Sequence, residues 1–291
     1  MLKSTIPLSL QAVRDRIASA MAASTQKQTQ VELIAVSMSK ARAAILQAYT
    51  AGQRKFGELH ASELRAKCEA LPDDCEWHFI GHLKNSAVCK ALVKCKNIAM
   101  VETVPSINVA DSLQRAVSKS HLYKDKVMDV LVQVRTGPEP ADSGCTVEQS
   151  LLLAHHVHRK CKSLRFRGIM GIAKSRKCYR ILQAVRAELS AALKLEENDL
   201  ILSLGNSTNF EDTIAYGATQ VRVGTAIFGK KYVAFTSEAG DSIPNWDAEP
   251  GTDRSSSYQC GNDDDSEPDT ENATCSDGHD NDDDTRPQMA A

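Results

Sequence analysis

The first absences in this sequence of 291 residues concern membranes and secretion. No window approaches the roughly 18 consecutive apolar residues that a membrane-spanning helix needs, so we exclude such a helix. The N-terminal stretch lacks the apolar core of a secretory signal, and it places Leu10, Val13, Ile17 and Met21 near helical spacing. We therefore expect a packed N-terminal helix, although the scarcity of acidic residues there leaves a mitochondrial presequence open.

Paired cysteine motifs are absent as well. The nine cysteines form an odd number with irregular spacing and contain no Cys-x-x-Cys pair, which argues against a zinc site or a disulfide framework. Reduced thiols in a cytosol-like compartment are the simplest interpretation. We therefore expect a cytoplasmic protein without a metal site.

The net charge of -2 is small but unevenly distributed. Residues 236–291 hold 16 acidic residues against two arginines, so the rest of the chain carries a net charge of +12. The lysines and arginines of that part are scattered, with no basic run interleaved with aromatic residues, so we expect no nucleic-acid partner. A solvated basic surface that attracts a small anionic ligand is the preferred interpretation.

The composition changes abruptly near residue 236. The last 56 residues lack apolar periodicity and are strongly acidic, so they cannot bury enough surface to fold alone. We predict two regions: a folded domain over residues 1–235 and a disordered acidic tail over residues 236–291.

From Val31 onward, short runs rich in valine and isoleucine alternate with segments of helical periodicity. Such alternation implies parallel strands joined by right-handed crossovers. Eight units in about 200 residues predict an α/β fold, a single (β/α)8 TIM barrel, with an open doubly wound sheet as the alternative. The expected strands cover residues 31–38, 54–58, 77–81, 97–102, 127–134, 164–172, 199–205 and 220–228.

Two turns made of small residues follow the last two expected strands. Ser207 lies in the first turn, and Gly224 and Thr225 form the second. In TIM barrels the loops after strands seven and eight are the usual phosphate site, because glycine lets backbone N–H groups approach the anion and a hydroxyl adds a donor. One such turn is weak evidence, since helix caps use the same residues. Two at the expected places favour a phosphate site.

Three further polar residues stand where strands end. Arg222 alternates with apolar neighbours on the last strand, so it faces the barrel interior or mouth, where its partner is either a ligand or an acid such as Glu58. His82 follows the third strand as a ligand contact or a simple helix-start residue. Lys40 follows the first strand, as a solvated lysine or an amine that reaches inward.

Several motifs resemble one known family over roughly residues 31–229. The stretches LIAVSMSK, RKFGELHASEL, WHFIGHLKN and VLVQV, then FRGIMGI and LSLGNSTNFEDTIAYGATQVRVGTAIFG, have the order and spacing of the pyridoxal phosphate homeostasis protein family. That family is similar in fold to the N-terminal domain of alanine racemase. The resemblance implies a one-domain barrel that holds pyridoxal 5'-phosphate on a lysine as a Schiff base, without established turnover, and that buffers or delivers this cofactor.

The resemblance also implies roles and partners. Ser207, Gly224 and Thr225 look like the phosphate cradle, and Arg222 looks like the residue that faces the pyridine nitrogen. His82, from its place after the third strand, is counted with them as a candidate cofactor contact. The expected partners are the cofactor and apo forms of enzymes that depend on it, and the expected state is a monomer without a membrane partner.

The chain departs from the family at the lysine position. Met38 stands where the family carries its Schiff-base lysine, Lys40 matches the second lysine, and Leu59 replaces a polar residue. A thioether cannot form an imine, so covalent attachment is in doubt. Residues two apart on a strand share a face, so Lys40 is the candidate substitute for the missing amine.

Two other functions remain open at this point. A weak one-domain amino-acid racemase would need two opposed acid-base groups, and position 38 supplies no lysine for one of them. A degenerate barrel that serves as a non-enzymatic interaction scaffold, with the acidic tail recruiting basic partners, is the third hypothesis.

Overall fold

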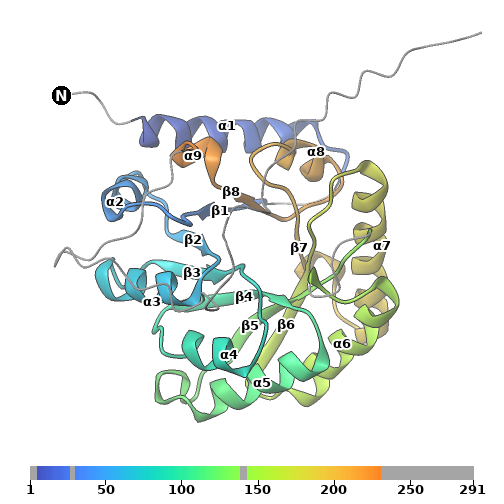
Figure 1. The fold of residues 1–291 in the computed structure, drawn as a ribbon. Coiled ribbons are helices and arrows are strands. Elements are labelled where there is room, and N and C mark those ends of the chain that lie inside the picture. Colours follow the sequence, from blue (N-terminus) through green and yellow to red (C-terminus); the bar gives the residue numbers. More distant parts are fainter. Residues whose placement is uncertain (1–4, 27–29, 138–142, 231–291) are drawn as a thin grey trace, which may run out of the picture. The chain divides into compact units, whose positions relative to one another are not determined.

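The structure is a computed structural model, and it describes residues 5–26, 30–137 and 143–230. The predicted acidic tail lies outside these residues. The predicted TIM barrel is confirmed: eight parallel strands follow one another around a closed barrel, and Glu32 on the first strand pairs with Gln220 on the last. The helices form an outer ring around them (Figure 1). The strands are β1 Glu32–Val36, β2 Lys55–Glu58, β3 Glu76–Phe79, β4 Ile98–Val104, β5 Met128–Gln133, β6 Leu164–Met170, β7 Ile201–Ser203 and β8 Gln220–Val223.

Several helices begin where the sequence supplies a side-chain cap. The Ser106 and Ser175 side chains accept backbone N–H bonds at the starts of two long helices, and Thr146 with Gln149 forms a complete capping box at a third. The helices are α1 Ile6–Ala23, α2 Arg42–Thr50, α3 Ala61–Ala70, α4 Ser86–Leu92, α5 Ile107–Lys119, α6 Val147–Lys160, α7 Arg176–Leu193, α8 Phe210–Ala215 and α9 Thr225–Phe228, with short 3-10 helices η1 His121–Tyr123 and η3 Glu197–Asp199.

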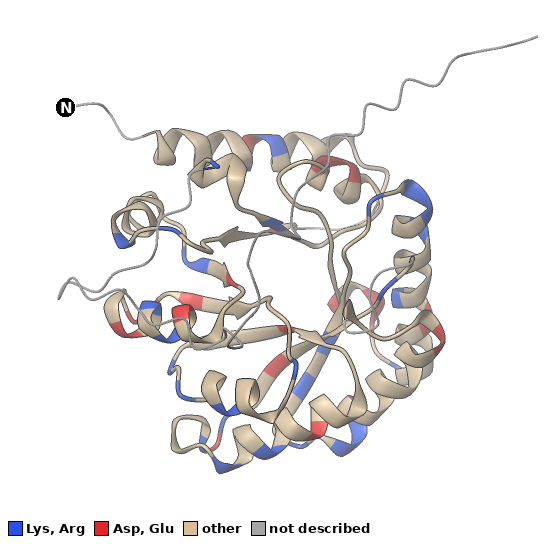
Figure 2. Cartoon of the chain, in the orientation of Figure 1, with Lys and Arg blue, Asp and Glu red and all other residues tan. Residues whose placement is uncertain are grey.

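The predicted N-terminal helix is confirmed as α1. Its apolar stripe of Leu10, Val13 and Ile17 is buried, and α1 packs beside α8 and α9 on the outside of the barrel (Figure 1). No helix within the described residues is long and apolar enough to cross a membrane. Lysine and arginine are spread over the outer helices among acidic residues rather than gathered in one run (Figure 2).

One predicted element is wrong in its extent. The eighth strand was expected to run to residue 228, but it ends at Val223, and Thr225–Phe228 form α9. Other strand limits differ from the expected ones by no more than two residues. The apolar run after Gly224 is therefore a helical turn that packs its one fully buried side chain, Ile227, onto the core. A short apolar run alone does not distinguish these two states.

The core has two parts. A continuous cluster fills the layer between the helices and the barrel wall, while Met100, Leu131 and Met170 form a small separate cluster. These three come from the adjacent strands β4, β5 and β6. Polar residues from β3, β4, β7 and β8 form a buried hydrogen-bonded network nearby, and this polar network leads to the candidate site.

Candidate functional site

The two small-residue turns meet at the carboxyl ends of β7 and β8. The Ser207 hydroxyl oxygen accepts hydrogen bonds from the backbone N–H groups of Gly224 and Ala226, each at 3.2 Å. The first amides of α9 thus point at an oxygen atom that belongs to the neighbouring loop. Thr225 is exposed between them. This arrangement of converging N–H donors and hydroxyls suits an anionic oxygen.

Glycine is required at the first turn and leaves little room for a side chain at the second. Gly205 has a φ of +92°, and a Cβ there would lie 2.3 Å from the Thr213 hydroxyl oxygen. At Gly224 a Cβ would lie 3.2 Å from the Val36 carbonyl oxygen, because the turn passes close to the end of β1. Gly205 thus excludes larger residues by strain and by contact, whereas a side chain at Gly224 would press tightly against the end of β1. They hold the Ser207 loop and the start of α9 together.

Arg222 reaches the interior from β8, as its alternation with the fully buried Val221 and Val223 predicts. Its guanidinium donates to the Ser203 hydroxyl at 2.6 Å and to the Gly171 carbonyl at 3.0 Å. Burial lowers the pKa of Arg222, and the charge of a nearby glutamate opposes that shift.

That glutamate is Glu102, and it is fully buried. It accepts hydrogen bonds from the Ser203 hydroxyl at 2.7 Å and shares a 2.7 Å hydrogen bond with His78 Nδ1. Burial alone would raise the pKa of Glu102, but the hydrogen bond and charge of His78, together with Arg222 and Ser203, outweigh it and hold that pKa below its ordinary value. Gln220 donates to the same serine at 3.0 Å. We call His78, Glu102, Ser203, Gln220 and Arg222 the interior network.

The proposed salt bridge between Arg222 and Glu58 is wrong. Glu58 lies on β2, where neighbouring residues face opposite sides of the sheet. A Cβ at Gly57 would contact Ile34 and Ile80, whereas the Glu58 side chain points the other way and contacts α3. Its carboxylate pairs with Lys67 of that helix, and both side chains are fully buried. Glu58 therefore belongs to the layer outside the barrel wall.

Lys67 is held by several groups at once. Its ammonium also pairs with Glu63 at 2.7 Å and donates to the Ser37 carbonyl at 2.6 Å. Burial, then the charge of Glu58, raises the pKa of Glu63, and Lys67 opposes that shift. We call Lys67, Glu58 and Glu63 the α3 cluster. It fastens α3 to the ends of β1 and β2.

The segment after β1 turns away from the extended path that the sequence suggested. Ser39 has a φ of +52°, and the Lys40 N–H donates to the Ser37 carbonyl, which closes a turn. Met38 and Lys40 therefore do not share a strand face, and that premise was wrong. The Lys40 ammonium donates instead to the Gly229 carbonyl at 2.8 Å, beyond the end of α9. Burial, then the charge of Lys67, lowers the pKa of Lys40.

His82 and Met38 are both half-buried at the mouth end of the barrel, in the loops after β3 and β1. The loop after β3 is fixed by a close contact: a Cβ at Gly81 would lie 1.7 Å from the Leu59 carbonyl oxygen. Only glycine allows this approach, so Gly81 places His82 beside the loop after β2.

Two cavities lie at the other end of the barrel. One of about 430 Å³ opens between α1 and the amino ends of β1 and β2, and one of about 270 Å³ lies at the amino ends of β3 and β4. Neither contains a residue of the two turns or of the interior network. Since ligands of this fold bind at the carboxyl ends of the strands, we assign the candidate site to the mouth.

Comparison with known proteins identifies the family of the chain. Residues 8–231 match the family described as alanine racemase, N-terminal domain. The pyridoxal phosphate homeostasis protein of Bos taurus is 33% identical over 241 residues, which cover 78% of this chain and 87% of the relative. That of Pseudomonas aeruginosa is 34% identical and covers 78% and 96%. The chain belongs to the pyridoxal phosphate homeostasis protein family.

Solved structures place this family member among related barrels. PipY of Synechococcus elongatus, solved with pyridoxal phosphate bound, has a TM-score of 0.59 and 29% identity, and the match covers 77% of this chain and all of PipY. The alanine racemase of Corynebacterium glutamicum, at 17% identity and a TM-score of 0.54, shares the fold alone.

Sequence reasoning missed most of the interior network and the α3 cluster. His78, Glu102 and Lys67 were not singled out, although a glutamate inside the apolar run IAMVETV was a signal that could have been used. A buried charge in a strand needs a partner, so it marks a place where several elements meet. The sequence could not show which partner it meets.

Proposed function

We propose that this member of the family binds pyridoxal 5'-phosphate at the barrel mouth and contributes to intracellular homeostasis of that cofactor by storing or delivering it, without turnover. The observation that carries the proposal is the pair of N–H groups at the start of α9 that converge on the Ser207 hydroxyl. The names of the curated relatives and the PipY structure with bound cofactor support it.

The phosphate fits the chemistry of the two turns. Gly224 and Ala226 offer N–H donors, and Ser207 and Thr225 offer hydroxyls. In the structure the Ser207 oxygen accepts the hydrogen bonds of both N–H groups. A phosphate oxygen that took its place would be a charged acceptor instead of a neutral one. Hydrogen bonds to charged groups are about twice as strong as neutral ones. The phosphate would therefore anchor the ligand.

Arg222 suits the ring of the cofactor. When bound, pyridoxal phosphate supplies a reactive aldehyde and a pyridine ring that accepts electrons. A guanidinium only donates hydrogen bonds, so it favours an unprotonated ring nitrogen, which weakens that electron acceptor. Glu102, through Ser203, holds the charged guanidinium in place. These residues favour holding the cofactor over carbanion chemistry.

Covalent attachment is the part that this chain does not share with the family pattern. Met38 offers no amine, and Lys40 is directed to the Gly229 carbonyl. We therefore propose that the cofactor is held non-covalently. Delivery to apo-enzymes, a monomeric state, a cytosolic location and the division into residues 1–235 and 236–291 stay predictions.

Equilibrium dialysis with pyridoxal phosphate tests the binding proposal. We expect saturable binding by the full chain and affinity about tenfold weaker in Ser207→Ala, since a hydrogen bond to a charged group contributes about 1.5 kcal/mol or more. Thr208→Ala, in the same loop, is the matched control. Absence of binding, or equal losses in both variants, contradicts the proposal.

Borohydride reduction followed by peptide mapping tests the mode of attachment. We expect no stable adduct in the natural chain and one adduct at position 38 in Met38→Lys. An adduct on Lys40 that is lost in Lys40→Ala would show that the proposed non-covalent attachment is wrong, while the proposal that the cofactor binds would remain.

A further inference from the structure

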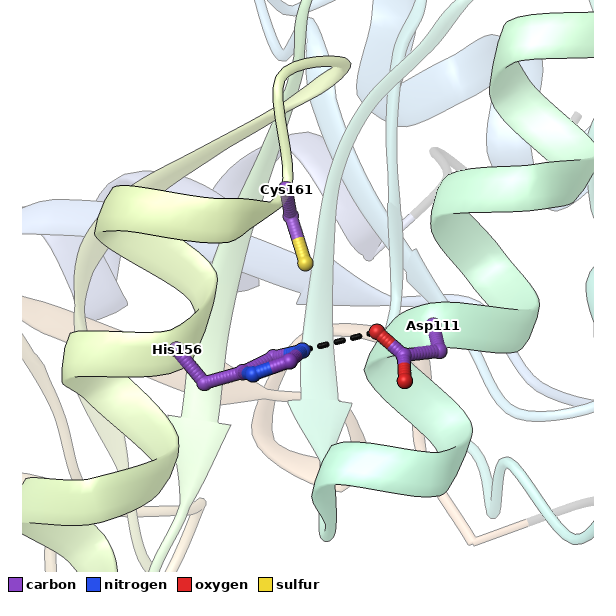
Figure 3. A group of neighbouring side chains, drawn as sticks. All are labelled: Asp111, His156 and Cys161. Atoms are coloured by element: carbon purple, nitrogen blue, oxygen red, sulfur yellow. Dashed lines mark hydrogen bonds and ion pairs between the residues drawn. The ribbon is translucent and has the colours of Figure 1, made fainter.

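A cluster of three side chains with metal-ligand chemistry lies in the helical layer, apart from the mouth. Asp111 on α5, His156 on α6 and Cys161 just after α6 converge there (Figure 3). Cys161 leads into the amino end of β6, so the cluster does not belong to the loops at the carboxyl ends of the strands. None of the three takes part in the interior network or the α3 cluster.

The three side chains present their donor atoms to one another. His156 Nε2 lies 2.7 Å from an Asp111 carboxylate oxygen, and the Cys161 sulfur points toward both (Figure 3). All three donor atoms lie within 4.8 Å of one another. Zinc bonds of about 2.0–2.3 Å at tetrahedral angles place ligand atoms roughly 3.3–3.7 Å apart. Side-chain shifts of about 1 Å would bring the cluster to that spacing.

The accessibility of the cluster suits an incoming ion. The side chains of His156 and Asp111 are 23% and 39% exposed, while Cys161 is buried beneath them. A metal ion could therefore reach the imidazole and the carboxylate from solvent, with the thiol behind. Three protein ligands leave a fourth tetrahedral position for water.

The charge of the cluster also suits a cation. The Asp111 carboxylate brings a negative charge beside the imidazole of His156 and the sulfur of Cys161. A dication that binds there would displace the proton of the Cys161 thiol and form the thiolate. A set of one thiolate, one imidazole and one carboxylate is typical of Zn²⁺ and similar transition ions rather than of Mg²⁺ or Ca²⁺.

We propose that Asp111, His156 and Cys161 bind one Zn²⁺ ion, which ties α5 to α6. The ion is coordinated by Asp111 Oδ1, His156 Nε2 and Cys161 Sγ, and the thiol proton leaves to solvent. The proposal does not depend on the cofactor site.

Titration of the full chain with Co²⁺, a spectroscopically visible substitute for Zn²⁺, tests the proposal. We expect a thiolate-to-cobalt charge-transfer band that saturates at one equivalent, disappears when Zn²⁺ is added, and grows stronger at higher pH. His156→Ala and Asp111→Asn should weaken binding by at least about tenfold, and Cys161→Ser should abolish the band.

Matched controls separate this site from other ligands in the chain. His155 is the exposed neighbour of His156 on the same helix, so His155→Ala should keep the band. The tail also holds Cys260 and Cys275, so Cys260→Ser/Cys275→Ser should keep it too. A band that is missing in the natural chain, survives in Cys161→Ser, or vanishes with the tail cysteines would overturn the proposal.

Stability provides the second measurement, because Cys161 is buried and its replacement can impair folding. Zn²⁺ should raise the Tm of the natural chain and of His155→Ala by a few degrees, and should raise that of His156→Ala clearly less. His156 is partly exposed, so its variant is expected to fold. An equal rise in Tm for His155→Ala and His156→Ala would contradict the site.

Discussion

Two cationic side chains lie on opposite sides of the barrel wall, and they are neutralised differently. Lys67, outside the wall, contacts two carboxylates directly. Arg222, inside it, reaches its carboxylate, Glu102, only through the Ser203 hydroxyl. The α3 cluster is therefore complete as it stands. The interior network keeps its cation near the mouth with donor capacity for a ligand.

From this difference we expect a structural role for the α3 cluster and, under the proposed function, a binding role for the interior network. A buried ion pair contributes little net stability, but removing one partner is costly because it leaves the other charge buried. The α3 cluster is expected to show that cost in stability alone. The interior network is expected to show it in both stability and ligand affinity, and the following substitutions test that division in order of decreasing effect.

Lys67→Met is expected to have the largest effect. It leaves Glu58 and Glu63 without their cation, so the free energy of unfolding should fall by about 3–5 kcal/mol. Urea denaturation measures this change. Adding Glu58→Gln to the variant should recover part of the loss. If Lys67→Met lowers the free energy of unfolding no more than the replacement of an exposed lysine does, the α3 cluster does not hold α3 to the barrel as we describe.

Glu102→Gln should follow, with a loss of about 3 kcal/mol at neutral pH and weaker cofactor binding. The folded-state pKa of Glu102 lies below its ordinary value, so its carboxylate stabilises the fold above the unfolded pKa near 4.3. That contribution disappears as the pH falls through the folded pKa. The free energies of unfolding of the natural chain and of Glu102→Gln should therefore converge as the pH falls. A difference between them that stays constant with pH would exclude the assigned role of Glu102.

Ser203→Ala interrupts the connection while keeping both charges. We expect a loss of about 1–3 kcal/mol in stability, because Arg222 and Glu102 each lose a buried hydrogen bond. Cofactor affinity should fall as Arg222 loses its anchor. Ser118→Ala, on the exposed face of α5, is the control and should change neither quantity. Unchanged affinity in Ser203→Ala would place the serine outside the binding role.

Lys55→Met should have the smallest effect. Lys55 pairs with Glu32 and, at 3.7 Å, with Glu76, but its side chain is 29% exposed. Partly exposed ion pairs contribute about 0–1 kcal/mol. Thermal unfolding of Lys55→Met and Lys67→Met, measured side by side, shows how much more a buried ion pair contributes to stability than a partly exposed one. A comparable loss of stability in the two variants would contradict the distinction between them.

The fold could be predicted from the sequence because it repeats one pattern eight times. Alternation of apolar runs and helical segments is a local property, and the glycine turns at Gly205 and Gly224 could be located without knowing their neighbours. The limit of β8 was mispredicted, because Thr225–Phe228 is as apolar as a strand yet forms a helical turn.

Only those site residues that directly follow a strand, or alternate within one, could be predicted from the sequence. Ser207, Gly224 and Arg222 stand at strand ends, whereas the connection of Arg222 to Glu102 depends on β4 and β7, which are about 100 residues apart. The orientation of Lys40 was mispredicted because one residue, Ser39, takes a left-handed conformation that no rule of alternation anticipates. Asp111, His156 and Cys161 were missed because their spacing crosses two helices.

The seam between β1 and β8 has a consequence for the newly made chain. Lys40 and Gly229 meet across 189 residues, and Gly224 passes close to Val36 only once the last strand has paired with the first. During synthesis the proposed phosphate cradle therefore forms last, after seven strands are already made. Capture of the cofactor would then report that the barrel has closed, and a chain that ends before β8 would lack this cradle.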